Sequence, residues 1–248
     1  MQCQYNPIAT MQAGDELRDG NCRPMYRAAG ATLMEEASDN WRELILRGKR
    51  VTKIVKVLPG SVNWDQPGGK LPKECAIWLE ELKRCGIDLD SAYPWHHESC
   101  LAAVSRTIIA DQDKYESWVD QRANRTFGLT LDTACQHPDR GDVDLTTMFA
   151  DLAEKETEGE NNILRYLNTT KRVCARRVLF LGQNGCFGLA PADARDGDEI
   201  CVLFGGEVPY VIREVDNGFE FVGESYCHGF MDGEAVCAKS SVDMFRLL

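Results

Sequence analysis

The sequence lacks both long apolar segments and an excess of positive charge. Its longest apolar runs, residues 178–181 and 200–204, are far shorter than the roughly 20 residues needed to cross a bilayer. Lys and Arg number 28 against 39 Asp and Glu, so the net charge is −11 and the field repels nucleic-acid backbones. We therefore expect no membrane span and no nucleic-acid partner.

Signals for secretion and for metal binding are also missing. The first 20 residues have no basic flank followed by an apolar stretch, which favours a cytoplasmic protein. The 11 cysteines include no Cys-x-x-Cys pair, and the loose spacing of His97 and Cys100 is not completed by a second pair. We expect free, mostly buried thiols, no metal and no cofactor.

The common catalytic signatures are absent as well. The sequence contains no Gly-x-Ser-x-Gly elbow, no phosphate-binding glycine loop ending in Lys-Ser or Lys-Thr, no Gly-x-Gly-x-x-Gly and no His-Glu-x-x-His. Hydrolase, kinase and dehydrogenase functions lose most of their support. Only four histidines are available to any site: His96, His97, His137 and His228.

What is present is an ordinary globular composition, with 44% hydrophobic and 27% charged residues. The pattern predicts the α+β class: a helical middle layer packed on a small antiparallel β-barrel or sandwich at the C-terminal end, with an N-terminal β-hairpin. No long linker interrupts the chain, so residues 1–248 are read as a single domain. Its parts are an irregular segment at 1–21, a hairpin at 41–58 turning at Gly48, a helical region at 70–171 and a β-rich module at 173–234.

Apolar periodicity places individual helices within the middle region. The clearest stripe begins at Cys75 and ends at Gly86, which suits the residue after a helix C-terminus. Further stripes predict helices at residues 101–109, 115–119, 144–152 and 163–167. Within 200–204 both faces are apolar, so we expect a central strand covered on one side by the helical layer.

Polar residues gather toward the end of the β-rich module. In a last strand, Phe219, Phe221 and Cys227 would share one face, and Glu220, Glu224, Tyr226 and His228 the other. Tyr210 and Arg213 belong to the neighbouring predicted strand. This set is interpreted either as a polar surface or barrel rim, or as a catalytic cluster.

Four stretches of this module closely resemble the C-terminal region of fungal heterokaryon-incompatibility (HET) proteins. Earlier pieces are similar to the middle region of the same family, so the resemblance extends from about Cys22 to Glu234. Arg106 and Asp111 lie in one of those earlier pieces and are read as a structural ion pair or cap. The matching stretches are residues 25–30, 50–57, 106–111, 185–191, 197–206, 208–213 and 222–234.

The resemblance implies a fungal protein, and two functions follow from it. Full-length family members begin with an N-terminal HET domain, which we do not expect here because the chain before Cys22 is short. One function is a non-enzymatic recognition or interaction module derived from a heterokaryon-incompatibility protein. The other is a cofactor-free cyclase of fungal secondary metabolism, because the chain also resembles, more distantly, the norbornene-forming Diels–Alderase of sordarin-type diterpenes.

We favour the cyclase, an intramolecular Diels–Alderase acting on a small apolar terpenoid or polyene. Such a reaction needs a cavity that folds the substrate and one or two hydrogen-bond donors, without nucleophile, metal or nucleotide. The candidate donors are Tyr226, His228 and Arg213. The candidate substrate-binding residues are Tyr210, Phe221, Trp118 and Glu224. A closed apolar pocket would favour the cyclase, and a solid barrel would favour the interaction module.

Overall fold

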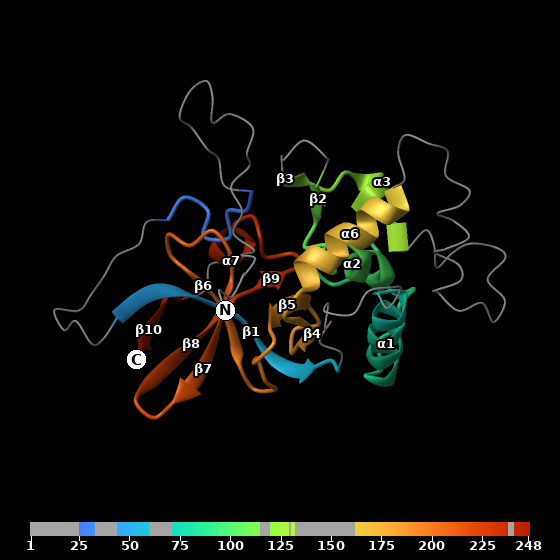
Figure 1. The fold of residues 1–248 in the computed structure, drawn as a ribbon. Helices are drawn as coiled ribbons and strands as arrows, with labels where there is room; N and C mark the ends of the chain where they lie inside the picture. The colour runs from blue at the N-terminus through green and yellow to red at the C-terminus, as the bar shows by residue number, and fades with distance from the viewer. Residues whose placement is uncertain are drawn as a thin grey trace, which may run out of the picture.

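The β structure consists of a barrel and an adjoining sheet that share one long strand, β1 (Leu44–Val57) (Figure 1). β1 pairs through residues 44–48 with β10 (Asp243–Leu247) and through 48–53 with β6 (Glu199–Leu203). Its last residues pair with β4 (Arg177–Gly182). The computed structural model describes residues 25–32, 44–59, 71–114, 120–128, 130–131, 162–237 and 241–248.

The expected hairpin at 41–58 is wrong, because the chain does not turn at Gly48. This glycine lies inside β1, where a Cβ atom would meet the carbonyl oxygen of Val202 at 2.3 Å. The glycine therefore allows two strands to approach closely at the point where β1 passes from β10 to β6. Register shifts at 50/52 and 54/56 then bend β1 out of the barrel and into the adjoining sheet.

The barrel closes because β10 pairs with strands on both of its sides. Its order is β1–β6–β7–β8–β10 and back to β1, with β7 at Tyr210–Val215 and β8 at Gly218–Glu224. All of these pairings are antiparallel except β10 with β8, which is parallel. The expectation of an α+β fold with a small barrel is confirmed. Closure depends on β1 and β10, both outside the 173–234 module.

The interior of the barrel is filled by apolar side chains. One buried cluster takes residues from β1, β6, β7 and β10, and Phe219 of β8 packs against it. Because every strand of the closed barrel contributes, this cluster occupies its interior. Its buried members are Leu46, Cys201, Leu203, Ile212 and Phe245.

The adjoining sheet continues from β1 through β4 and β5 (Phe187–Pro191) to the short β9 (Tyr226–Cys227). Side chains alternate along β4: Val178 and Phe180 pack toward the barrel, while Leu179 and Leu181 belong to the cluster shared with the helices. This sheet therefore lies between the helices and the barrel, as Figure 1 shows. The expectation that the helices cover the strand at 200–204 is wrong, because Ile200 and Val202 of β6 pack with Val178 and Phe180.

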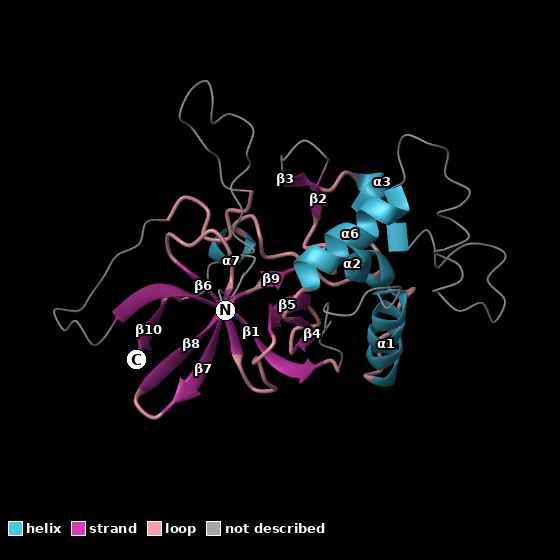
Figure 2. Ribbon diagram, in the orientation of Figure 1, coloured by secondary structure: helices cyan, strands magenta, loops and turns pink. Residues whose placement is uncertain are grey.

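Except for the short helix at 234–237, the helices gather on the outer face of this sheet (Figure 2). The helix expected to end at Gly86 is confirmed as α1 (Leu71–Arg84), and Gly86 has a φ of +83°. The N–H of Ile87 bonds the carbonyl of Leu82, and that of Gly86 the carbonyl of Lys83, which is a complete Schellman motif. The stripes at 101–109 and 163–167 are confirmed as α2 (Cys100–Thr107) and α6 (Asn162–Cys174).

Other predicted helices fall on residues outside the described part of the chain. These are the helix at 144–152 and the one at 115–119, which includes Trp118. Two short strands, β2 (Gln112–Lys114) and β3 (Asp120–Arg122), pair antiparallel. Two short helices complete the described elements, α3 (Arg125–Gly128) and α7 (Glu234–Cys237). None of the helices in the described ranges is long and apolar enough to cross a membrane.

Candidate functional site

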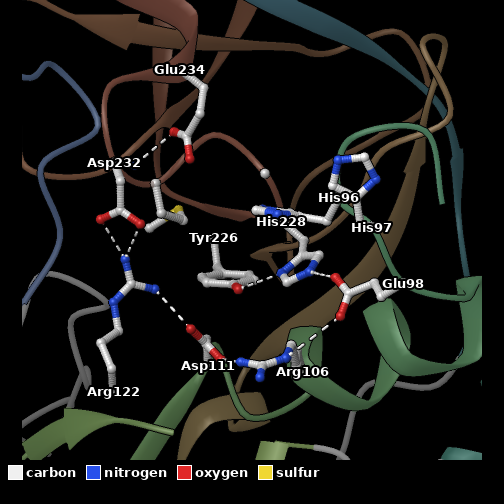
Figure 3. Close-up of a pocket in the computed structure, with 12 residues that line it drawn as sticks. His96, His97, Glu98, Arg106, Asp111, Arg122, Tyr226, His228, Asp232 and Glu234 are labelled. Carbon is white, nitrogen blue, oxygen red and sulfur yellow. Dashed lines mark hydrogen bonds and ion pairs between the residues drawn. The ribbon is translucent and has the colours of Figure 1, made fainter. Parts of the chain in front are cut away.

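A pocket of about 350 Å³ opens where the loop before α2, strand β3 and the segment after β9 meet (Figure 3). Most of its lining is charged or polar, and Tyr226 lies in the middle of the charged groups. The lining residues are His96, His97, Glu98, Arg106, Asp111, Arg122, Tyr226, His228, Gly229, Met231, Asp232 and Glu234. The pocket is open and most of its lining residues have polar or charged side chains, so it is not the closed apolar pocket expected for a polyene cyclase.

Strand β9 brings Tyr226 and His228 to the same side. The last predicted strand is in fact two, because β8 ends at Glu224 and the chain leaves the barrel at Ser225 to pair with β5. The N–H of His228 bonds the carbonyl of Phe187 at 2.9 Å, which extends that pairing. The two side chains then meet, with the Tyr226 hydroxyl 2.7 Å from Nδ1 of His228. Their predicted common face is confirmed.

His228 also reaches the helical side of the molecule through Glu98. Nε2 of His228 lies 2.6 Å from Oε1 of Glu98, just before the α2 N-cap residue Ser99. Burial works to raise the pKa of Glu98, but the hydrogen bond from His228 and the charge of Arg106 outweigh it and lower the pKa. An ionised carboxylate only accepts hydrogen bonds, so Nε2 carries a proton and donates.

A second series of charges runs from Glu98 to the opposite wall of the pocket. Arg106 of α2 forms an ion pair with Glu98, Nε to Oε2 at 3.6 Å, and a hydrogen bond through Nη1 with Oδ1 of Asp111. The other oxygen of Asp111 accepts from Nη1 of Arg122 at 3.1 Å, and Nη2 of Arg122 contacts both oxygens of Asp232 at 2.6 Å. The expected structural ion pair of Arg106 with Asp111 is confirmed.

The turn after α2 holds Asp111 in this position. Ala110 and Asp111 have φ angles of +47° and +51°, which L-residues with side chains adopt only at a cost of about 1–2 kcal/mol each. The hydroxyl of the buried Tyr26 donates to the carbonyl of Ala110, and Arg122 stacks on the Tyr26 ring at 4.4 Å. The fold thus keeps two strained residues in place and aims a carboxylate between two guanidinium groups.

The resulting chain of contacts, named here the charge chain, consists of Tyr226, His228, Glu98, Arg106, Asp111, Arg122 and Asp232. Its arrangement at Tyr226, His228 and Glu98 resembles a catalytic triad with a phenol in place of a nucleophile. Burial, however, raises the pKa of Tyr226 well above its ordinary value. The phenol therefore stays protonated and serves as a donor to His228 rather than as a base or nucleophile.

The structure does not bring Arg213 to this pocket. Its guanidinium contacts both oxygens of Asp198 at 2.9 Å, and Asp198 is 3% exposed. A further bond runs from Arg213 to the carbonyl of Asp193. The expectation that Arg213 acts beside Tyr226 and His228 is wrong, because its guanidinium is ion-paired with the buried carboxylate of Asp198 and does not line the pocket.

The expected wall residues also lie elsewhere. Tyr210 and Phe221 stack on each other on the barrel, with ring centroids 5.6 Å apart, and Phe221 is 47% exposed. Glu224 ends β8, and its carbonyl accepts from Arg177. None of these three lines the pocket, because the change of sheet at Ser225 separates them from Tyr226. Trp118 lies outside the described residues.

Sequence reasoning missed most of the residues that complete the pocket. Glu98, Arg122 and Asp232 come from three separate segments, and no local spacing links them. The sequence feature that pointed to this loop is the pair His96 and His97 directly before Glu98, because the sequence contains only four histidines. Within the described residues, no group of three or more His, Cys, Asp or Glu side chains has a geometry that would hold a metal ion.

Comparison with known proteins gives one family and one relative. The model of the Het-6 beta-barrel domain matches residues 102–247. The heterokaryon incompatibility protein 6, OR allele, of Neurospora crassa is 37% identical over 70 residues, which cover 27% of this chain and 10% of that protein. The chain therefore matches about a tenth of the length of that curated relative. No solved structure matches.

Proposed function

Because the chain belongs to the Het-6 beta-barrel domain family, we propose that it is a non-enzymatic recognition module derived from a heterokaryon-incompatibility protein. The name of the N. crassa relative supports the derivation. The charge chain supports the recognition role, because it fixes the shape of a polar pocket before any ligand arrives. A site held in its binding geometry loses less entropy on association, which raises affinity.

The single observation that carries this proposal is that the charge chain joins three distant parts of the sequence around one pocket. Glu98 precedes α2, Arg122 ends β3, and His228 follows β9. These parts are fixed by buried groups, since Tyr226 is 1% and His228 5% exposed. The rim, by contrast, is open: Asp232 has a side chain that is 59% exposed. A rigid floor and an open polar rim suit the binding of a polar ligand.

The cyclase hypothesis receives less support from the same features. The barrel interior is filled by Phe245 and its neighbours, and the described pocket is open and carries paired charges among its lining residues. Charged walls do not fold a polyene into a reactive shape, because desolvating them for an apolar ligand costs free energy without returning hydrogen bonds. The comparisons support the incompatibility resemblance and provide no support for a Diels–Alderase.

Site-specific photo-crosslinking tests the recognition role. A crosslinking amino acid is placed at His97, on the pocket rim, or at Glu214, an exposed residue of β7 on the barrel, and each protein is exposed to fungal lysate. We expect adducts specific to position 97 that disappear when Glu98→Gln is added. Equal labelling at both positions would contradict the proposal.

A second readout addresses catalysis directly. The unlabelled protein is incubated with a metabolite extract of the same fungus, and the extract is analysed by mass spectrometry. A recognition module leaves every metabolite unchanged. Time-dependent conversion of one compound into an isomer of identical mass would overturn the proposal in favour of a cyclase.

A further inference from the structure

The sequence contains two Asn-Gly pairs, and the structure places them in different surroundings. Asn184 and Gly185 lie in the turn between β4 and β5, while Asn217 and Gly218 lie where β7 turns into β8. An asparagine followed by glycine is prone to deamidation, because glycine has no side chain to keep its backbone nitrogen away from the preceding amide. The two pairs share this chemistry, so the structure decides which of them reacts.

The reaction requires the asparagine side chain to turn toward the next peptide group. The backbone nitrogen of the glycine attacks Cγ of the asparagine and forms a new N–C bond. The bond from Cγ to the side-chain nitrogen breaks, and ammonia leaves with the proton of the glycine N–H. Water then opens the resulting succinimide ring at either carbonyl, which gives aspartate or isoaspartate. In isoaspartate the main chain runs through the former side chain and is longer by one carbon atom.

The side-chain amide of Asn184 is held at both of its polar atoms. Nδ2 donates to the carbonyl of Val51 at 3.2 Å, and Oδ1 accepts the N–H of Cys186 at 3.2 Å. The nitrogen that would attack is also engaged, because the N–H of Gly185 donates to the carbonyl of Gly182 at 2.9 Å. Cyclisation would have to break all three hydrogen bonds, so the folded protein protects Asn184.

The side chain of Asn217 has no such restraint. Asn217 is exposed and has a φ of +71°, and its side-chain amide makes no hydrogen bond with any described residue. Its backbone carbonyl accepts from Nη1 of Arg246 at 3.4 Å. Gly218 pairs with Val215 at the very end of the β7–β8 ladder, where pairs open most readily. Cγ of Asn217 is therefore free to approach the Gly218 nitrogen.

The same turn borders the seam that closes the barrel. A Cβ atom on Gly218 would meet the carbonyl oxygen of Arg246 at 2.6 Å, so β8 and β10 are in close contact here. Their pairing places Phe219 opposite Leu247, and the N–H of Leu248 donates to the carbonyl of Phe219 at 3.0 Å. An extra main-chain carbon directly before β8 would move both partners of this short pairing out of register.

From these features we infer that Asn217 is a modification site, which deamidates in the folded protein while Asn184 is protected, and that isoaspartate at this position weakens the closure of the barrel. The product also adds a negative charge to a turn that already carries the exposed Glu214 and Asp216. This inference concerns the barrel and is independent of the pocket and of its proposed recognition function.

Peptide mapping by mass spectrometry measures both sites in one sample of the full chain after prolonged incubation in mildly alkaline buffer. The mass gained when NH₂ is replaced by OH identifies deamidation, and methylation by protein isoaspartyl methyltransferase identifies isoaspartate. We expect at least tenfold more conversion at Asn217 than at Asn184. Equal conversion at the two positions in the folded protein would overturn the inference.

The unfolded chain in guanidinium chloride is the matched control, because both Asn-Gly pairs then lack the surrounding structure. We expect the two asparagines to convert at similar rates there, which assigns the difference in the folded protein to its hydrogen bonds. If Asn217 reacts in the unfolded chain but stays intact in the folded one, the turn protects it and the inference is wrong.

The variant Asn217→Gly tests the consequence for the barrel. It removes the reactive amide and keeps the turn, since glycine readily adopts a φ of +71°. After the same incubation, the melting temperature of the wild type should fall as isoaspartate accumulates, whereas that of the variant should stay at its initial value. An unchanged melting temperature of the modified wild type, or an equal fall in the variant, would show that isoaspartate at position 217 does not weaken the barrel.

Discussion

Nε2 of His228 lies 2.6 Å from Oε1 of Glu98, although the two residues are 130 positions apart in the sequence. This contact ties the strand after the barrel to the loop that begins α2. Because the ionised Glu98 accepts from Nε2, Nδ1 is the acceptor of the neutral imidazole, and the protonated Tyr226 hydroxyl donates to it.

Glu98→Gln should destabilise the protein by about 2 kcal/mol at pH 7, because a charge-assisted hydrogen bond is replaced by a neutral one. The pKa of Glu98 is lower in the folded protein than its ordinary value of 4.5, so its contribution is present above pH 4.5 and is lost as the pH falls through the folded pKa. The gap between wild type and variant should therefore narrow below about pH 4. Urea unfolding at pH 7, 5, 4 and 3 measures this, and a gap independent of pH would contradict the assigned ionisation of Glu98.

Tyr226→Phe should cost about 1–2 kcal/mol, because Nδ1 of His228 loses its donor in a buried site. Tyr210→Phe is the matched control, since the Tyr210 hydroxyl makes no hydrogen bond with any described residue; we expect it to cost less than about 0.5 kcal/mol. Chemical denaturation measures both, and ¹⁵N NMR of His228 should show a proton on Nε2 in the wild type. A proton on Nδ1 would show that the Tyr226 hydroxyl accepts instead of donating.

Arg122→Met should destabilise the fold by about 3 kcal/mol, because Asp111 loses a partner in a largely buried position. Arg122→Lys should recover less than half of this loss, since an ammonium cannot bind two carboxylates in a fork and stack flat on Tyr26. Asp232→Asn is the control and should cost less than about 1 kcal/mol, because its side chain is 59% exposed. Full rescue by lysine in thermal unfolding would show that charge alone matters at position 122.

Gly48→Ala should destabilise the barrel by about 3 kcal/mol or more, because the new methyl group would meet the Val202 carbonyl oxygen at 2.3 Å and the Phe245 ring at 3.1 Å. Gly86→Ala serves for comparison: it has a φ of +83° but open space around a Cβ, so it should cost only about 1 kcal/mol. Differential scanning calorimetry of both variants measures these losses of stability. A larger loss for Gly48→Ala is expected if β1 and β6 approach closely at Gly48. Equal losses of stability in the two variants would contradict the close approach of β1 and β6 at Gly48.

Local regularities of the sequence explain the elements that were predicted. The apolar stripe from Cys75 and the glycine at 86 locate α1 because helical period and the left-handed cap are properties of neighbouring residues. The common side of Tyr226 and His228 follows from the two-residue period of a strand. The failure at Gly48 has a similar cause: a glycine between apolar runs indicates a turn or a close approach equally well, and only the neighbouring strand β6 distinguishes them.

The apolar stripe of α1 and the common side of Tyr226 and His228 can be derived from the sequence, because both features depend on residues within a few positions of one another. The pairing of Arg213 with Asp198 cannot be derived in this way, and neither can the gathering of Glu98, Arg122 and Asp232 around the pocket. An ion pair forms with whichever charge the packed chain brings within reach. The choice of partner is therefore set by the way β1 and β10 close the barrel and by the way the helices cover β4 and β5.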